Sequence, residues 1–237
     1  MEMSRAVSKE GISYIEARPL SGHPTGVIVL LHGGGGNAND FVPLLRQITP
    51  PGVSVRYILP EAKLLKLTLF DGALLHAWYD VRYADLQRDE DFVGVRRAAA
   101  ILKAFVAREE AHGVPTERII IGGFSQGGAV SLYAALRYPR RLGGVFSLSG
   151  YLPGLRRAHS EASVAGRQLS AFIGHGREDK LVSINLAQAS AQALADAGCK
   201  VAFHEFPINH SVSEDELVLL RDWIAVRLNS HSESGCV

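Results

Sequence analysis

A serine set between two glycines carries the clearest chemical signal in this sequence. Residues Gly123-Phe124-Ser125-Gln126-Gly127 match the pattern G-x-S-x-G, after the apolar run Ile119–Ile121 and before the helical pattern Val130–Tyr138. A strand, a tight turn and a helix in this order hold a nucleophilic serine above a sheet and place backbone N–H groups beside it, where they can meet a developing oxyanion. This context favours Ser125 as a nucleophile for acyl transfer over a chance glycine turn.

A candidate acid follows a later apolar run, so that serine and acid stand in the chain order expected for a Ser, Asp, His set. Asp179 ends a glycine-containing loop after Ala171–Gly174, and loops beyond the carboxyl ends of parallel strands are where such sheets place their sites. A carboxylate there can hold an imidazole in the required tautomer. Asp179 is the predicted acid, with Glu178 as its rival and a solvated surface charge as the alternative for either.

The candidate base is His210, which follows the apolar run Val201–Phe206 and precedes the last helical pattern. A loop at that place can reach the same edge of the sheet and take the proton of the nucleophile. Two other histidines fit less well, because His204 lies inside the predicted strand and His175 stands between glycines, where backbone geometry can matter more than the ring.

A second glycine cluster, Gly33–Gly36, follows His32 and the apolar run Val27–Leu31. A phosphate-binding loop is the alternative interpretation, but the segment lacks the Gly-Lys-Ser/Thr ending of a P-loop and the G-x-G-x-x-G dinucleotide pattern. It is typical of an oxyanion loop, whose backbone N–H group lies opposite the one that follows the nucleophile.

These candidates follow short apolar runs that alternate with helical patterns, as in βα units. Apolar character on both faces of the runs predicts a mostly parallel sheet with helices on each side. The predicted strands are Val27–Leu31, Val53–Leu59, Ile119–Gly122, Gly144–Leu148, Ala171–Gly174 and Val201–Phe206, with Ile12–Ala17 as a weaker edge strand. The predicted helices are Asp40–Gln47, Phe92–His112, Gln126–Tyr138, Ile184–Ala197 and Glu214–Leu228, the last opened by a capping box of Ser213 and Glu216.

Length and composition predict a single α/β domain over residues 1–237, with flexible tails at 1–10 and 229–237. Hydrophobic residues make up 47% of the chain and the formal charge is +1, so neither disorder nor a nucleic-acid-binding surface is indicated. The start lacks the apolar core of an export signal, and no apolar stretch is long enough to span a bilayer. We therefore expect a cytoplasmic protein without integral membrane association.

The two cysteines, Cys199 and Cys236, are expected to be free thiols, because Cys236 lies in the polar tail. No pair of Cys or His residues has metal-ligand spacing, since His204 and His210 are separated by a segment that contains proline. We expect no bound metal, and the homodimeric state is left open.

Several motifs, taken together, resemble one family. They are Leu31-His32-Gly33, Ala77-Trp78-Tyr79-Asp80, Gly123-Phe124-Ser125-Gln126-Gly127-Gly128-Ala129, His175-Gly176 with Asp179, and His210. The set resembles the acyl-protein thioesterase family, also called the phospholipase/carboxylesterase family, over roughly Gly26 to Leu228. The acidic run Arg88–Asp91 before a long helix is similar as well.

The resemblance implies a minimal α/β-hydrolase fold without a large cap domain. It implies hydrolysis of carboxylic esters or thioesters of short to medium acyl chains, with lysophospholipids or acyl-proteins as alternative natural substrates. This hydrolysis requires no cofactor. By position, the backbone N–H groups of Gly34 and Gln126 would donate to the oxyanion. Trp78 would lie near the acyl pocket, with core packing as its alternative.

Three departures from the family pattern limit what the resemblance implies. The family usually reads His-Gly-x-Gly-Asp, whereas here Gly35, Gly36 and Asn37 follow Gly34, which predicts a looser oxyanion loop. The stretch Pro60–Gly72 replaces a proline-rich segment, so the substrate rim is expected to differ, and Asn209 stands where a glycine usually precedes the catalytic histidine.

The apolar stretch Leu64–Leu75 matches neither a strand nor a helix cleanly and has a turn at Asp71-Gly72. Leu67 and Phe70 are predicted to form part of the acyl-chain wall, and a buried core strand is the alternative. Two other functions stay open at this point. A hydrolase-fold protein that binds a ligand without turnover is disfavoured by the intact Ser, Asp and His set, and a dienelactone-type hydrolase is disfavoured by serine, not cysteine, at position 125.

Overall fold

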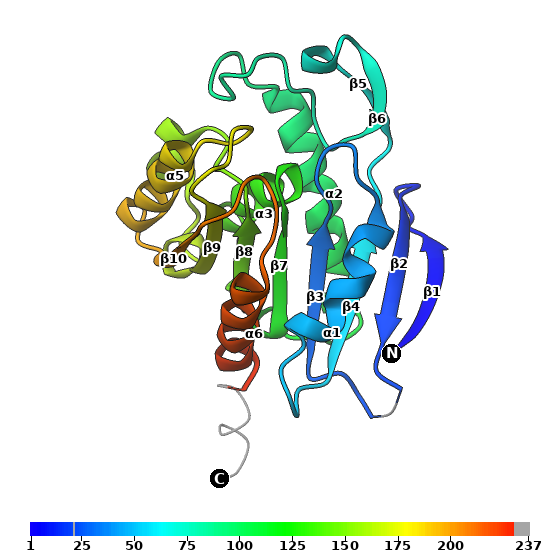
Figure 1. Ribbon diagram of the computed structural model, residues 1–237. Helices are drawn as coiled ribbons and strands as arrows, with labels where there is room; N and C mark the ends of the chain where they lie inside the picture. The colour runs from blue at the N-terminus through cyan, green and yellow to red at the C-terminus, as the bar shows by residue number, and fades with distance from the viewer. Residues whose placement is uncertain (21, 230–237) are drawn as a thin grey trace.

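The computed structural model describes residues 1–20 and 22–229, and their centre is an eight-stranded sheet in the spatial order β1-β2-β4-β3-β7-β8-β9-β10 (Figure 1). Strands β2 and β4 pair antiparallel, as do β1 and β2, and all pairs from β4 to β10 are parallel. The strands are β1 (Glu2–Val7), β2 (Ser13–Arg18), β3 (Gly26–Leu31), β4 (Val55–Pro60), β7 (Ile119–Phe124), β8 (Gly144–Leu148), β9 (Ser170–Gly176) and β10 (Lys200–Phe206).

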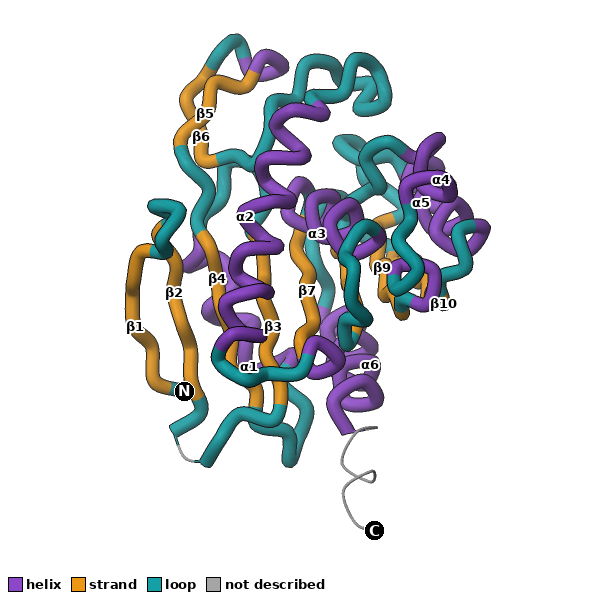
Figure 2. The backbone as a smooth tube through the Cα atoms, turned by 180° about the vertical axis from the view of Figure 1, so that it is seen from behind, coloured by secondary structure: helices purple, strands orange, loops and turns teal. Residues whose placement is uncertain are grey.

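Helices cover both faces of the sheet. α1 (Leu45–Ile48) and α6 (Glu214–Asn229) lie on one face, and α2 (Phe92–Ala111), α3 (Gln126–Leu136) and α5 (Ile184–Asp196) lie on the other (Figures 1 and 2). Alternation along β9 sends Ala171 and Ile173 into the core under α2, α3 and α5, and sends Phe172 into the core under α6. The remaining short helices are α4 (Ala158–Glu161) and the 3₁₀ helices η1 (Ala38–Leu44), η2 (Thr68–Phe70), η3 (Thr116–Arg118), η4 (Leu155–Arg157) and η5 (Gly166–Gln168).

The predicted mostly parallel sheet and its helical layers are confirmed, and no separate cap domain is present in the described residues. The capping box of α6 is also present, because Glu216 N–H donates to Ser213 Oγ at 3.2 Å and Ser213 N–H donates to the Glu216 carboxylate at 3.4 Å. This cap places the start of α6, at Glu214, four residues after His210.

The N-terminal segment differs from the expected flexible tail. Residues 2–7 form β1, which pairs along its whole length with β2 and makes β1, not β2, the edge strand. Its side chains are largely exposed, so the pairing depends on backbone hydrogen bonds, which hydrophobic periodicity does not reveal. The other expected tail, beyond Asn229, lies outside the described residues, as does Cys236.

The helix expected over Asp40–Gln47 is mostly a 3₁₀ helix, η1, with Pro43 inside it and a single α-helical turn, α1, after it. Proline has no backbone N–H to donate and is poorly accommodated in an α-helix, so the regular i→i−4 ladder does not form here.

The stretch that fitted no pattern forms a separate hairpin of β5 (Leu64–Leu67) and β6 (Ala73–His76), drawn above the carboxyl ends of the parallel strands in Figure 1. The predicted turn at Asp71-Gly72 closes it, with φ of 53° and 75° at the two residues. Leu64 and Phe70 are 53% and 49% exposed, so the hairpin is not the buried core strand of the alternative prediction.

Candidate active site

Ser125 lies at the turn between β7 and α3 in a backbone conformation that side-chain-bearing residues rarely adopt, with φ 52° and ψ −120°. The strain is tolerated because strand and helix pack tightly around the turn. A Cβ on Gly123 would collide with the backbone of Leu31 and Gly127, and a Cβ on Gly127 would collide with Leu31. The two glycines of the motif are therefore required by close backbone approach.

The side chains of Ser125, His210 and Asp179 form a continuous hydrogen-bonded chain. His210 Nε2 lies 2.9 Å from Ser125 Oγ, and His210 Nδ1 lies 2.7 Å from Asp179 Oδ2. Three loops, which follow β7, β9 and β10, bring these residues together at the carboxyl edge of the sheet. With Nδ1–H donated to the carboxylate, Nε2 can accept the serine proton.

The carboxylate of Asp179 is held in place by its own loop. Its Oδ1 accepts hydrogen bonds from the backbone N–H groups of Leu181 and Val182, both at 2.9 Å. These bonds leave Oδ2 for the imidazole of His210, and only 7% of the Asp179 residue is exposed. Because both oxygens of this buried carboxylate are hydrogen-bonded, Asp179 is a rigid support for the His210 ring.

The rival residues lie elsewhere. The neighbouring Glu178 is exposed to solvent, and His204 sits within β10 with its ring 5.1 Å from that of Phe172. His175 is fully buried beneath the site, 2.8 Å from the carbonyl of Val182 and 3.4 Å from Asp179 Oδ2. Burial lowers the pKa of His175, so the ring supports the Asp179 loop as a neutral group.

The glycine cluster forms a loop that lies against the turn after Ser125. A Cβ on Gly34 would lie 3.0 Å from Cδ of Gln126, so Gly34 packs against the side chain of Gln126. Gln126 is the first residue of α3, where a backbone N–H has no acceptor within its own helix. Both residues border the cavity that contains Ser125 and His210.

Hydrogen bonds hold the oxyanion loop, although its sequence departs from the family pattern. Gly36 N–H donates to the carbonyl of Gly33, and Gly35 N–H donates to that of His76. His32 Nδ1 lies 2.7 Å from the Gly33 carbonyl, while its Nε2 accepts from Ala62 N–H at 3.0 Å. Burial lowers the pKa of His32, which keeps the ring neutral with its proton on Nδ1.

A cavity of about 250 Å³ opens beside Ser125. Among the described residues that line it, Ser125, Gln126, His210 and two tyrosines are polar, and the rest of the wall is apolar. The predicted wall residues Leu67 and Phe70 line it, together with Leu69, Leu75, Tyr79, Val81, Leu86, Tyr151, Leu181 and Val182. The hairpin β5–β6 thus supplies one side of the cavity, and the loop that carries Asp179 supplies another.

The prediction that Trp78 borders the acyl pocket is wrong, and the core-packing alternative describes it. Trp78 is 3% exposed, and its indole Nε1–H donates to the carbonyl of His32 at 2.7 Å. A buried indole N–H needs an acceptor. The available acceptor lies under the oxyanion loop, so the ring is directed there and away from the catalytic cavity.

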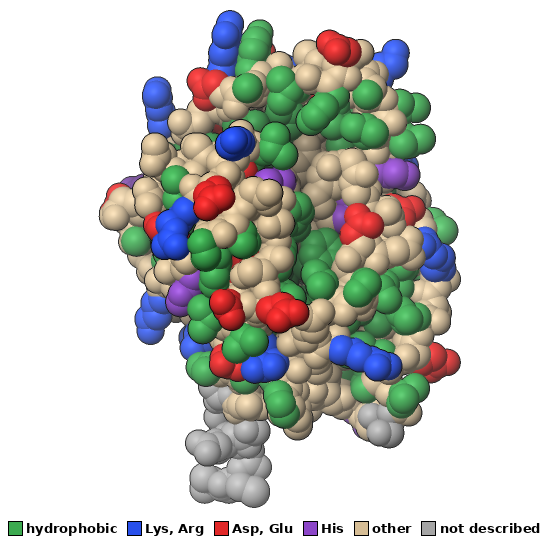
Figure 3. Space-filling model, in the orientation of Figure 1, with side chains coloured by type: hydrophobic (Ala, Val, Ile, Leu, Met, Phe, Trp, Pro, Cys, Tyr) green, Lys and Arg blue, Asp and Glu red, His purple; other side chains and the backbone are tan. Residues whose placement is uncertain are grey.

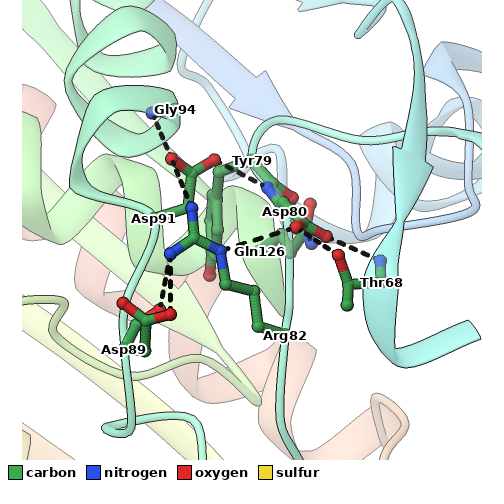
Figure 4. Close-up of polar contacts among 8 residues, drawn as sticks. All are labelled: Thr68, Tyr79, Asp80, Arg82, Asp89, Asp91, Gly94 and Gln126. Carbon is green, nitrogen blue, oxygen red and sulfur yellow. Dashed lines mark hydrogen bonds and ion pairs between the residues drawn. The ribbon is translucent and has the colours of Figure 1, made fainter. Parts of the chain in front are cut away.

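The side chain of Gln126 links the turn after Ser125 to the backbone of Trp78 and Tyr79. Its side-chain oxygen accepts from Trp78 N–H at 3.0 Å, and its Nε2 donates to the carbonyl of Tyr79 at 3.2 Å. Figure 4 shows the network continuing from there, with Arg82 surrounded by Asp80, Asp89 and Asp91. Asp91 also caps α2 by accepting from Gly94 N–H at 2.9 Å.

Two tyrosines of the cavity were missed by the sequence analysis. Tyr79 donates a hydrogen bond to the Tyr151 hydroxyl at 3.1 Å, and burial raises the pKa of both phenols. A signal for each was present, because Tyr79 belongs to the Trp-Tyr-Asp motif and Tyr151 follows β8 at the carboxyl edge of the sheet. Neither signal indicated that the two rings would meet.

Other features bear on what the site can bind. Cys199 is a buried free thiol whose pKa burial raises to about 11. Within residues 1–20 and 22–229, no group of three or more His, Cys, Asp or Glu side chains is arranged to hold a metal ion. No helix in the same residues is long and apolar enough to cross a membrane.

Comparison with known proteins identifies related chains and a shared fold. Acyl-protein thioesterase 1 of Schizosaccharomyces pombe is 36% identical over 171 residues, which cover 72% of this chain and 75% of the relative. The crystal structure of Arabidopsis thaliana SOBER1 superposes with a TM-score of 0.81 at 30% identity, covering 86% of this chain and 99% of that one. Zea mays acyl-protein thioesterase 2 superposes with a TM-score of 0.78 at 30% identity, covering 91% and 98%.

The family model described as Phospholipase/Carboxylesterase matches residues 15–228, which include every residue of the Ser125, Asp179 and His210 set. With that match and the relatives above, the chain belongs to the phospholipase/carboxylesterase family of α/β hydrolases.

Proposed function

We propose that this protein hydrolyses carboxylic esters or thioesters of short to medium acyl chains through an acyl intermediate on Ser125. The observation that carries the proposal is the unbroken chain from Ser125 Oγ to His210 to Asp179, with contacts of 2.9 and 2.7 Å. A nucleophile, a base and an orienting acid at hydrogen-bond distance are the parts that two-step acyl transfer needs.

In the first step, His210 Nε2 takes the proton of Ser125 while Oγ attacks the substrate carbonyl carbon. The oxyanion that forms is stabilised by the backbone N–H groups of Gly34 and Gln126, which the surrounding hydrogen bonds hold in position. His210 then gives its proton to the departing oxygen or sulfur as the bond to the acyl carbon breaks. Asp179 stabilises the imidazolium throughout.

In the second step, water gives a proton to His210 and its oxygen attacks the acyl-serine carbonyl. The tetrahedral intermediate collapses, the carboxylic acid leaves and Ser125 regains its proton from His210. No step needs a cofactor. The neutral, apolar wall of the 250 Å³ cavity suits the hydrocarbon part of the acyl group.

Three classes of natural substrate fit the same chemistry. The relative named acyl-protein thioesterase 1, at 36% identity, favours a thioester on a protein, and the family description favours a carboxylic ester or a lysophospholipid. A cytoplasmic location and a homodimer stay predictions.

The test combines turnover with covalent labelling. Ser125→Ala should lower hydrolysis of p-nitrophenyl butyrate and butyryl-CoA on the order of 10⁶-fold, as removal of a catalytic serine does in subtilisin. It should also abolish labelling by a fluorophosphonate, whereas the exposed-serine control Ser160→Ala should retain both. A folded Ser125→Ala protein that keeps a tenth of the activity would exclude Ser125 as the nucleophile, and wild-type protein that binds esters without turnover would favour the ligand-binding alternative.

A further inference from the structure

A second cavity, of about 230 Å³, adjoins the catalytic cavity across the oxyanion loop. Gly34 and Phe124 line both cavities, so the second cavity lies directly beside the predicted oxyanion donor Gly34. The far walls of the second cavity come from η1, with Asp40, Phe41 and Leu44, and from Val212, two residues after His210. Figure 3 shows this face of the molecule hollowed along its middle, with hydrophobic side chains inside the hollow.

The carboxylate of Asp40 borders the second cavity, is exposed to solvent and pairs with no cationic side chain of the described residues. The carboxylate of Asp40 accepts from the backbone N–H of Asn37 at 2.8 Å and from its side-chain amide at 3.1 Å. Both donors are neutral, and they fix the carboxylate in place without compensating its charge. Among residues 1–20 and 22–229, no Lys, Arg or His side chain forms an ion pair with Asp40.

Aromatic rings accompany this charge. Phe41 lies beside Asp40 in the wall and is 6% exposed, and Phe124 lies between the two cavities with its ring 4.9 Å from that of His210. The face of an aromatic ring attracts cations, and alkylammonium groups in particular. A carboxylate and two phenyl rings around one cavity are suited to a positively charged, partly apolar group.

The two cavities correspond to the two halves of an ester. With its carbonyl oxygen between Gly34 and Gln126, a substrate directs its acyl chain and its leaving group away from Ser125 in different directions. The first cavity has an uncharged wall and suits the acyl chain, which leaves the second for the alcohol or thiol. Phe124, which lines the second cavity, has its ring 4.9 Å from that of His210, the imidazole that must protonate the leaving group.

We propose that the cavity formed by Asp40, Phe41, Leu44 and Val212 binds a cationic leaving group, an alcohol or thiol that carries an alkylammonium or quaternary ammonium group. The inference rests on the proposed function and specifies its substrate class. The chemistry is unchanged: the bond from the acyl carbon to oxygen or sulfur breaks, and the leaving atom takes the proton that His210 received from Ser125.

The test uses two thioesters of the same acyl chain and nearly the same shape. Butyrylthiocholine has a cationic leaving group, and S-(3,3-dimethylbutyl) thiobutyrate replaces its nitrogen with carbon. The ratio of kcat/KM for the two is measured in wild type and in each variant. Intrinsic reactivity of the two thioesters and the amount of folded enzyme cancel when this ratio is compared between proteins.

Asp40→Asn should lower the ratio about threefold, the size of an exposed ion pair, and added salt should lower the wild-type ratio toward the variant's value. The asparagine oxygen can still accept from Asn37 N–H, so the turn of η1 is preserved. Asp40→Glu should keep most of the ratio.

Phe41→Leu should lower the kcat/KM ratio about threefold through loss of the ring face. Asp222→Asn, which removes an exposed charge on α6 away from both cavities, should leave it unchanged.

An Asp40→Asn ratio equal to that of wild type would overturn the inference, as would an equal fall in the Asp222→Asn control. The proposed function fails separately, if neither thioester is hydrolysed and no fluorophosphonate reacts with Ser125. Turnover of both thioesters without any effect of Asp40 would leave the hydrolase intact and remove only the cationic site.

Discussion

The carboxylate of Asp80 accepts two hydrogen bonds from Thr68, one from the backbone N–H at 2.7 Å and one from the hydroxyl at 2.6 Å. Thr68 begins η2, whose Leu69 and Phe70 border the catalytic cavity. Leu69 N–H also donates to the carbonyl of Val81 at 2.8 Å. Asp80 therefore fastens the tip of the β5–β6 hairpin to the segment that Gln126 holds beside the oxyanion turn (Figure 4).

From this contact we predict that Asp80→Asn loosens the acyl wall. Loss of a charge-assisted bond should raise KM for an octanoate ester about tenfold while acetate, which barely reaches the wall, changes less. Steady-state kinetics on p-nitrophenyl esters measures both. Thr68→Ser keeps both donors and should resemble wild type, whereas Thr68→Val should show a weaker form of the Asp80→Asn defect. Equal losses on acetate and octanoate would contradict a role limited to the wall.

The acyl wall itself can be tested at an exposed position. Phe70 is 49% exposed, so Phe70→Ser should cost little stability, while Leu67, at 1% exposed, should destabilise the fold when changed to Ser. Each buried methylene contributes about 0.8 kcal/mol, or about fourfold in kcat/KM. Phe70→Ser should flatten the rise in kcat/KM from acetate to octanoate. Leu64→Ser, on the same hairpin but outside the cavity, is the control, and an identical profile in the two variants would exclude the wall.

Substitutions can show which of two adjacent residues, Glu178 or Asp179, orients His210. Asp179→Asn should keep the geometry of the loop but favour the wrong tautomer of His210, lowering kcat about 10⁴-fold. Glu178→Gln should have little effect, because its side chain is exposed to solvent. Circular dichroism and thermal melting check that both variants fold. If Glu178→Gln were the inactive variant, the contact between His210 and Asp179 would not be the productive one.

Stability should depend on pH through Glu216. Burial raises the pKa of Glu216 to about 7, so between its ordinary value and about 7 the folded chain holds a proton that the unfolded chain has released. This stabilisation is complete below the ordinary value and is lost as pH rises to about 7, by at most about 3 kcal/mol.

Urea unfolding of wild type and Glu216→Gln, measured from pH 4.5 to 8, checks this sign. As pH rises, the free energy of unfolding of wild type should fall relative to that of Glu216→Gln, because the glutamine stays neutral. Glu214→Gln, an exposed change in the same helical turn, should show no such trend. A difference that does not vary with pH would show that folding leaves the pKa of Glu216 at its ordinary value.

Local sequence was enough to find the elements that build the catalytic centre. The glycines around Ser125, the capping box before α6 and the apolar runs of the parallel strands each act within a few residues, and turn chemistry and periodicity report such effects directly. Chain order then placed Asp179 and His210 in loops at one edge of the sheet. Side-chain contacts among the three follow from that topology.

Tertiary structure alone decided where side chains from different loops point. Trp78 faces the oxyanion loop because the His32 carbonyl is the acceptor its buried indole finds, and residues 2–7 form a strand because β2 offers an open edge. The second cavity likewise requires η1, the oxyanion loop and the segment after His210 to converge around Asp40. Residues distant in the sequence supply the acceptor of a buried donor, the partner of an edge strand and the walls of a cavity. Local sequence patterns carry no information about such distant partners.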